Sequence, residues 1–132
     1  MQNTVWGRAA RAAASAWLAA NLLQGGVGLL IWRLFSPLRP LDAQNLWGVA
    51  PVESGLRGAL LGVWLRWDAI HYLRIAQVGY AETMLSNFFQ IYPLLGRWMG
   101  VGDELMGLWL LSRLAFAAAL ILLYRLPAVF AD

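Results

Sequence analysis

The chain has 132 residues, of which 61% are hydrophobic and 13% charged, whereas about a quarter are charged in an ordinary globular domain. This composition and the eight tryptophans are typical of a membrane protein, because Trp collects where lipid tails meet headgroups. The net charge of +3 includes no basic run, so we set nucleic-acid binding aside, and the absence of cysteine excludes disulfides and thiolate metal sites.

The first predicted element is a transmembrane helix at residues 9–34. Its central part, 12–32, contains no charged residue, and about 20 apolar residues span a hydrocarbon core. Glycines and polar residues weaken this helix, so we expect its small residues to pack against other helices. A secretory signal peptide is the alternative. An uncleaved anchor is favoured, because the apolar run is longer than a signal core and no small-residue cleavage site follows it.

Residues 35–104 form the predicted connection between two transmembrane helices. The stretch 36–55 is rich in Pro, Gly, Asn and Asp and predicts irregular chain. From residue 56 to about 78, apolar and aromatic residues recur at helical spacing. This pattern predicts an amphipathic helix, or a broken pair of helices, lying in the membrane interface.

A further apolar stretch, residues 87–101, is too short to cross a bilayer. Pro93 is expected to interrupt it, and the residue before a proline favours an extended backbone, so Tyr92 is predicted to be extended. We interpret this stretch as another interfacial or re-entrant piece.

The second predicted transmembrane helix covers residues 105–126. Arg113 near its centre costs about 2.5–3.5 kcal/mol on the insertion scale, and each leucine returns about 0.3–0.6 kcal/mol. Eight leucines lie between residues 105 and 124, so the segment should insert. Arg113 must then face protein or water, where it pairs with an acid, reaches an interface or contacts an anionic group.

The expected fold class is therefore an all-α membrane protein with two transmembrane helices. Positive charge marks the cytoplasmic side of a membrane protein, and Arg8, Arg11 and Arg125 flank the two spans. Residues 33–104 carry six arginines and six acids, which sum to zero. We expect an integral protein of a bacterial plasma membrane, with both ends cytoplasmic and the loop 35–104 extracytoplasmic.

The most polar part of this loop is RWDAIHYLRIAQVGYAE, residues 66–82. On a helix, Asp68, His71, Tyr72 and Ile75 share one face. A carboxylate at the membrane surface can act as a general base on a sugar hydroxyl, while arginines hold a phosphate leaving group. Asp68 is also a candidate helix N-cap, which residue chemistry alone favours, and the two roles are compatible.

Neighbouring residues leave similar alternatives open. His71 is an interfacial aromatic or a substrate contact, and one imidazole with one carboxylate does not make a closed metal site. Arg66 and Arg74 suit lipid headgroups or a substrate phosphate. Gly79 is expected to end the helix, and Tyr80 to lie where the chain turns back.

Three segments, RWDAIHYLRIAQVGY, NFFQIYPLLGRW and LLSRLAFAAALILLYRL, together resemble the amino-terminal part of the PIG-V family of mannosyltransferases. These are relatives of GPI mannosyltransferase 2 within the GT-C superfamily of multispanning glycosyltransferases. The resemblance covers residues 60–126, and the pairing of WDA…GY with FF…YP is its most specific part. Two positions differ from the family pattern: Gln90 replaces a proline, and Arg113 stands where a neutral residue is usual.

The resemblance implies a GT-C fold whose long first extracytoplasmic loop carries juxtamembrane helices. It implies transfer of a sugar from a polyprenyl-phosphate donor to a hydroxyl acceptor, with Asp68 as the essential acid. The candidate substrate-binding residues are Arg66, His71, Tyr72, Arg74, Tyr80, Tyr92 and Arg113. No cofactor is identified beyond the lipid-linked donor, and a need for a divalent metal is left open.

Members of this family have many more spans, so we expect the chain to be an amino-terminal fragment or a truncated reading frame. We expect it to be inactive in isolation and to need further helices or a partner subunit. Its expected partners are these helices, membrane lipids and the lipid-linked sugar. The alternative function is a non-enzymatic two-span protein, either an assembly subunit or a degenerate remnant. In that case Trp64, Trp67 and Tyr72 anchor the loop in the interface and Asp68 has no chemical role.

Overall fold

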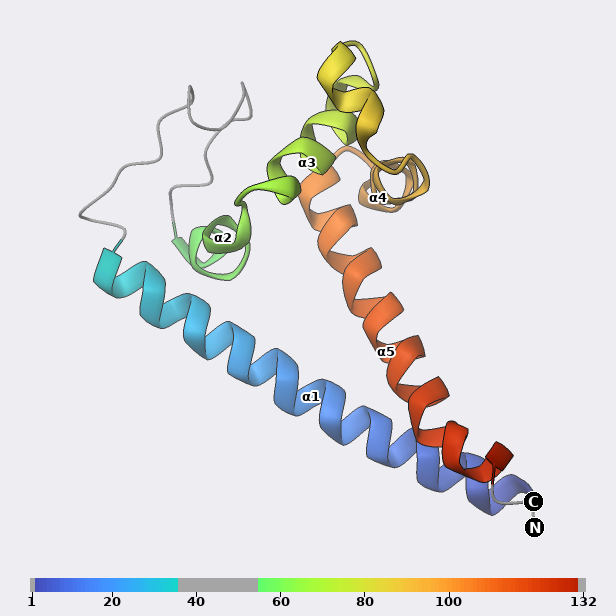
Figure 1. Cartoon of the computed structure of the whole chain (residues 1–132). Coiled ribbons are helices and arrows are strands. Elements are labelled where there is room, and N and C mark those ends of the chain that lie inside the picture. Colours follow the sequence, from blue (N-terminus) through green and yellow to red (C-terminus); the bar gives the residue numbers. More distant parts are fainter. Residues whose placement is uncertain (1, 36–54, 131–132) are drawn as a thin grey trace. The chain divides into compact units, whose positions relative to one another are not determined.

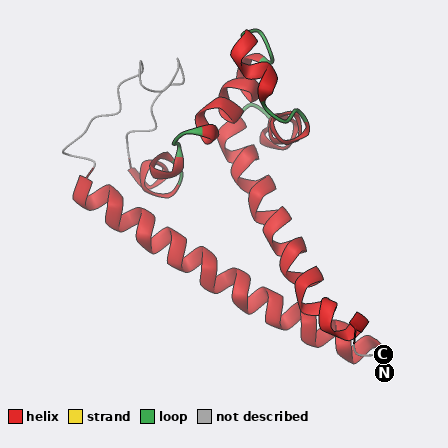
Figure 2. Ribbon diagram, viewed as in Figure 1, coloured by secondary structure: helices red, strands yellow, loops and turns green. Residues whose placement is uncertain are grey.

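A computed structural model describes residues 2–35 and 55–130 of the chain, and every regular element in these two stretches is a helix (Figure 1). Figure 2 shows the same helices joined by loops. The predicted irregular stretch 36–55 lies almost entirely outside the described residues. The described part of the chain is therefore all-α.

Two helices are long and apolar enough to cross a membrane. They are α1, Gln2–Phe35, with a candidate span at Trp6–Phe35, and α5, Glu104–Phe130, with a candidate span at Glu104–Leu126. The first span contains the predicted segment 9–34, and the second contains the predicted segment 105–126. Length and composition alone identify them, and a signal sequence near the N-terminus has the same properties as the first.

The chain divides into two compact units. Unit 1 comprises Met1–Gln24 and Ser112–Asp132, and unit 2 comprises Gly25–Leu111. Within unit 1, the indole Nε1 of Trp17 donates a hydrogen bond of 3.0 Å to the backbone oxygen of Arg113. The small side chains of Ala9 and Ala13 are buried there. A small side chain in a buried position lets another helix approach closely, as expected for the alanine-rich start of α1.

The first helices of unit 2 follow the broken-pair alternative for residues 56–78. α2 covers Gly55–Leu60, a short 3₁₀ helix η3 covers Gly62–Trp64, and α3 covers Asp68–Val78. α3 ends at Gly79, as predicted, because its φ of 76° is accessible to glycine without steric cost and its N–H donates to the oxygen of Ile75 at 2.8 Å.

Gly28 of α1 packs closely against α2 and η3. A Cβ on Gly28 would lie 2.6 Å from the backbone oxygen of Ala59 in α2 and 3.3 Å from the Nε1 of Trp64 in η3. A Cβ on Gly26 would meet nothing within 4 Å. The prediction that α1 packs against other helices through its small residues is therefore confirmed at Gly28, and Gly26 takes no part in this contact.

The core of unit 2 lies where α3 meets the start of α5. Its buried members are Leu65, Ile70, Leu73, Ala76 and Leu108. Tyr72, Tyr92 and Leu105 pack against this cluster. These contacts hold α3 against the first turns of α5 and so position the loop residues that carry the candidate chemistry.

The helix α4, Ile91–Gly100, corrects two predictions about residues 87–101. Pro93 does not interrupt the helix, because it lies in the first turn, where its missing N–H would have had no helical partner. Tyr92 is helical and not extended. Pro93 is also fully buried, so packing holds the tyrosine in a conformation that a following proline disfavours.

Candidate functional site

Asp68 is the first residue of α3, and its side chain is exposed. The alternative role as N-cap is wrong, because Trp67 occupies that position and no side-chain cap hydrogen bond forms. Among the described residues, no hydrogen bond or ion pair to the Asp68 carboxylate is found. The carboxylate lies in the first turn of α3, near the backbone N–H groups that have no helical partner.

Trp67 has an unusual backbone, with φ of 47° and ψ of −123°, and its side chain is 86% exposed. A bulky residue with positive φ is strained, and such strain costs about 1–3 kcal/mol. The sharp turn at Trp67 sets the direction in which α3 begins. It therefore determines where the neighbouring Asp68 carboxylate is presented.

Four aromatic rings join α3 to the FF…YP segment. The ring of Phe88 lies 4.9 Å from that of His71 and 5.4 Å from that of Tyr72, measured between centroids. Tyr72 also meets Tyr92 of α4 edge to face at 5.0 Å. His71, Tyr72, Phe88 and Tyr92 are called the aromatic cluster below. The two sequence motifs that carry the family resemblance thus pack directly against each other.

Hydroxyl groups fix the edges of this cluster. The hydroxyl of Tyr92 donates to the backbone oxygen of Leu108 in α5 at 3.2 Å, and that of Tyr80 donates to the oxygen of Phe88 at 3.3 Å. Tyr80 is half-buried, and this burial raises the pKa of its phenol above the ordinary value, with a smaller contribution from Tyr72. The phenol of Tyr80 therefore keeps its proton, and its hydrogen bond to Phe88, to a higher pH than an ordinary tyrosine does.

The two loop arginines make contacts within the protein. Arg74 donates from Nε and Nη2 to the same carboxylate oxygen of Glu82, at 3.2 and 3.1 Å. Arg66 donates from Nη1 to the backbone oxygens of Leu65 and Gly62, at 2.9 and 3.5 Å. Arg74 is thus paired with an acid, whereas Arg66 is exposed, contacts backbone oxygens and lies two residues before Asp68 in the sequence.

The candidate residues belong to different units. Arg66, Asp68, His71 and Arg74 lie in unit 2 together with the three tyrosines at 72, 80 and 92. Arg113 lies in unit 1, where it is half-buried. The candidate loop residues therefore lie in one unit, and Arg113 lies in the other.

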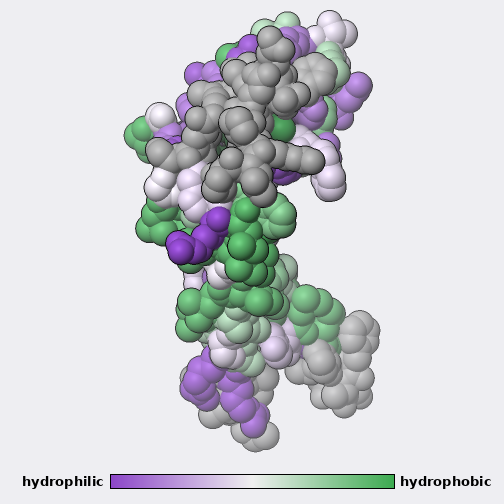
Figure 3. Space-filling model, turned by 90° about the vertical axis from the view of Figure 1, so that its left-hand side faces the viewer, coloured by the Kyte–Doolittle hydropathy of each residue, from purple (hydrophilic) through white to green (hydrophobic). Residues whose placement is uncertain are grey.

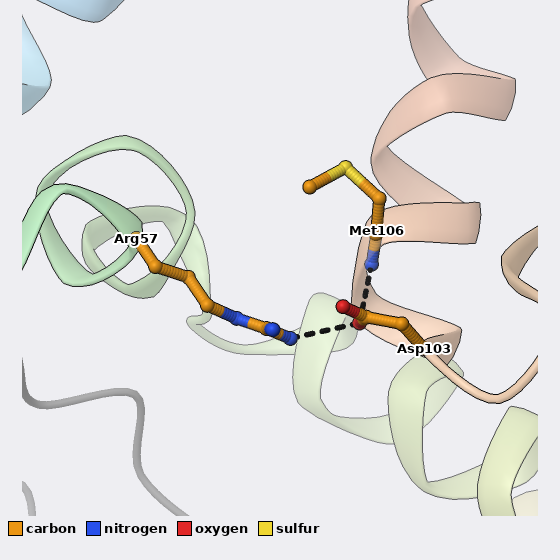
Figure 4. Close-up of polar contacts among 3 residues, drawn as sticks. All are labelled: Arg57, Asp103 and Met106. Carbon is orange, nitrogen blue, oxygen red and sulfur yellow. Dashed lines mark hydrogen bonds and ion pairs between the residues drawn. The ribbon is translucent and has the colours of Figure 1, made fainter.

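Sequence reasoning missed Asp103, the residue before α5. Its Oδ1 accepts hydrogen bonds from the Nη2 of Arg57 in α2 at 2.7 Å and from the backbone N–H of Met106 at 3.1 Å (Figure 4). One carboxylate thus caps α5 and ties α2 to it. The sequence GDEL, an Asp followed by Glu and an apolar run, is the signal from which this cap can be predicted.

The arrangement offers an exposed carboxylate at the start of the helix that also carries His71 and Tyr72 of the aromatic cluster. This combination suits proton acceptance from a hydroxyl group and contact with a sugar ring. Within residues 2–35 and 55–130, no three His, Asp or Glu side chains gather as they would around a metal ion. Comparison of the chain with protein-family models, curated proteins and solved structures gives no match.

Proposed function

We propose that this chain is part of a membrane glycosyltransferase of the GT-C type, which moves a sugar from a polyprenyl-phosphate donor to a hydroxyl acceptor. The observation that carries the proposal is the packing of Phe88 against His71 and Tyr72. It brings together the two motifs on which the resemblance to the PIG-V mannosyltransferases rests. Asp68 stays exposed at the start of the same helix.

In this reaction the Asp68 carboxylate accepts the proton of the acceptor hydroxyl. The acceptor oxygen forms a bond to the anomeric carbon of the sugar, while the bond from that carbon to the phosphate oxygen breaks. The electron pair leaves with the polyprenyl phosphate, and in this proposal Arg66 stabilises the negative charge of that phosphate. The site requires a loop on the extracytoplasmic face, α1 and α5 as transmembrane helices, and further helices to enclose the lipid.

The test is sugar transfer in membranes from the cells in which the chain occurs, where any further helices or partner subunit are also present, with a polyprenyl-phosphate mannose labelled on the sugar. Asp68→Asn should reduce transfer to background while membrane insertion is retained, because the amide cannot accept the proton. Glu104→Gln is the matched control, since Glu104 also lies in the first turn of a helix and should be dispensable. Full transfer by the Asp68 variant would remove this residue from the mechanism.

A second candidate is a non-enzymatic two-span protein whose loop anchors it in the interface. The ion pair between Arg74 and Glu82 favours it, because this arginine is already engaged within the protein. In this case neither unaltered chain nor Asp68 variant transfers sugar, whereas replacement of Trp64 and Trp67 by serine weakens attachment of the loop to lipid. Trp67 is 86% exposed, so its loss should be tolerated by the fold.

A further inference from the structure

Unit 1 carries an arginine held against a tryptophan at the end where α1 begins and α5 ends. The guanidinium carbon of Arg125 lies 3.1 Å from the ring centroid of Trp6. A guanidinium over an indole face is attracted by the ring quadrupole, so this contact fixes the orientation of the Arg125 side chain. Trp6 itself is 47% exposed, so the pair lies at the surface.

Two further arginines lie on the same end of unit 1. Arg8 and Arg11 are exposed and, three residues apart in α1, share one face of the helix. The guanidinium of Arg11 reaches back over the preceding turn, where its Nη1 lies 3.8 Å from the position a Cβ on Gly7 would take. At 100° per residue, Arg8 and Arg11 lie on a different side of α1 from Trp6. The three arginines at this end of unit 1, Arg8, Arg11 and Arg125, together with Trp6, are called the basic cluster below.

No acid neutralises the basic cluster within the described part of unit 1. Residues 1–24 and 112–130 contain four arginines, at 8, 11, 113 and 125, and neither Asp nor Glu. The Nε of Arg125 is buried and has no hydrogen-bond partner among the described residues. Figure 3 shows hydrophilic side chains gathered at the lower end of the view, where Figure 1 places the start of α1 and the end of α5. Among the described residues of unit 1, the positive charge of the cluster therefore has no acidic partner.

Apolar surface begins directly beside these charges. The candidate spans start at Trp6 and end at Leu126, so the basic cluster lies at one end of both. Leu122, Leu123 and Leu126 of α5 are 66%, 58% and 46% exposed. A ligand that combines a negative headgroup with hydrocarbon chains satisfies both surfaces, whereas a free anion satisfies only the charges.

We propose that the basic cluster binds the phosphate of an anionic phospholipid, with the acyl chains lying against the leucines of α5. Arg125, oriented by Trp6, donates hydrogen bonds to the phosphate oxygens, and Arg8 and Arg11 supply further positive charge. This site lies in unit 1 and involves none of the residues of the proposed glycosyl transfer. It is independent of that function.

The test uses the purified full chain in detergent with equal amounts of phosphatidylglycerol and phosphatidylcholine, and native mass spectrometry counts the bound lipids. The unaltered chain should prefer phosphatidylglycerol, and each arginine near an anionic lipid contributes about a fivefold preference. Arg125→Gln should lower the preference by about that factor, and the triple Gln variant at 8, 11 and 125 should abolish it. Arg97→Gln is the matched control, because Arg97 is an exposed arginine of unit 2.

Two further measurements distinguish a phospholipid site from a site for free anions. Trp6→Phe should keep the preference and Trp6→Leu should reduce it, because only an aromatic ring orients the guanidinium. Inorganic phosphate in excess should leave the bound phosphatidylglycerol in place. The proposal is overturned by displacement with inorganic phosphate, by equal binding of both lipids to the unaltered chain, or by an equal loss in the Arg97 control. Circular dichroism of each variant establishes that the helices are intact.

Discussion

Gly107 is the residue with the tightest surroundings in α5. A Cβ at this position would collide with the backbone oxygen of Gly96 and would lie 2.6 Å from the backbone nitrogen of Gly100. Neither of these atoms belongs to a flexible side chain, so the helices themselves would have to move apart. The three glycines thus allow the backbones of α4 and α5 to touch, as small residues do in membrane helix pairs.

Gly107→Ala is expected to destabilise the protein by about 1–3 kcal/mol, the usual cost of forcing extra atoms into a packed contact. The measurement is the free energy of unfolding in mixed detergent micelles, followed by circular dichroism. Gly26→Ala is the control, since a Cβ there meets nothing within 4 Å and alanine favours a helix over glycine by about 1 kcal/mol. Equal stability of the two variants would contradict the observed contact.

Tyr80 gives the protein a pH dependence in the alkaline range. Burial raises the pKa of its phenol in the folded protein, so the folded state holds this proton more tightly than the unfolded state. The resulting contribution to stability is complete below the ordinary pKa of tyrosine, about 10, and is lost as the pH rises from there through the raised value. The hydrogen bond to the oxygen of Phe88 is lost with the proton.

Absorbance titration of tyrosinate should therefore show one phenol that ionises above the ordinary pKa and is missing in Tyr80→Phe. The stability of this variant should fall less steeply at alkaline pH than that of the unaltered chain. Tyr124→Phe serves as control, because Tyr124 lies in the span of α5 in the other unit. Removal of a phenol with an ordinary or lower pKa by Tyr80→Phe would contradict the assignment.

At the scale of elements, the aromatic cluster joins α3 to α4. Tyr72 belongs to the former and Tyr92 to the latter, and their rings meet at 82°. Edge-to-face aromatic pairs contribute about 0.5–1.5 kcal/mol beyond the area they bury. The two helices also share the core around Leu108, so ring contact and core packing act together.

A double-mutant cycle isolates the ring contact. Tyr72→Leu and Tyr92→Leu should each destabilise the protein, and the double variant should lose less than the sum of the two by about 0.5–1.5 kcal/mol. The measurement is the free energy of unfolding of all four proteins in the same detergent. Pairing Tyr92→Leu with Trp98→Leu is the control cycle, because Trp98 is 79% exposed, and it should show additive effects.

The sequence predicted best those elements that depend on neighbouring residues in the chain. The long apolar runs, the helix after Asp68 and its end at Gly79 depend on composition and on single residues. The prediction that Pro93 interrupts a helix was wrong, because proline is unfavourable in the interior of a helix but is tolerated in the first turn. The contacts of Phe88 with His71 and of Arg57 with Asp103 join residues far apart in the chain, so periodicity carried no information about them.

α4 also presents an apolar stripe outward. Ile91, Leu94 and Trp98 recur at helical spacing and are 57%, 55% and 79% exposed. Such a stripe suits a helix lying in the membrane interface, which stays a prediction for this segment. The exposure of Trp98 agrees with the preference of indoles for that zone.

At the scale of the whole molecule, the two apolar helices and the arginines at their ends predict which parts of the chain face each side of a membrane. The absence of cysteine allows single cysteines to be introduced as markers. With both ends cytoplasmic, Ser86→Cys should react with a membrane-impermeant maleimide in intact cells, and Asn3→Cys should react only after permeabilisation. Ser86 is exposed and Asn3 precedes the candidate span Trp6–Phe35, so a difference in reactivity reports sidedness. Reaction of both markers from outside would contradict the predicted topology.

The contact of Gly107 with Gly96 has a consequence for how α4 and α5 can be aligned. Each residue of an α-helix corresponds to about 100° of rotation about its axis. A slip of α5 by one position would bring Met106 or Leu108 to the place where only a hydrogen fits. A hairpin with leucines at this face tolerates such slippage by repacking, whereas this one has a single permitted register. Residues 101–103 connect α4 to α5. Because the glycine contact fixes how the two helices align, it also fixes the length of this connection.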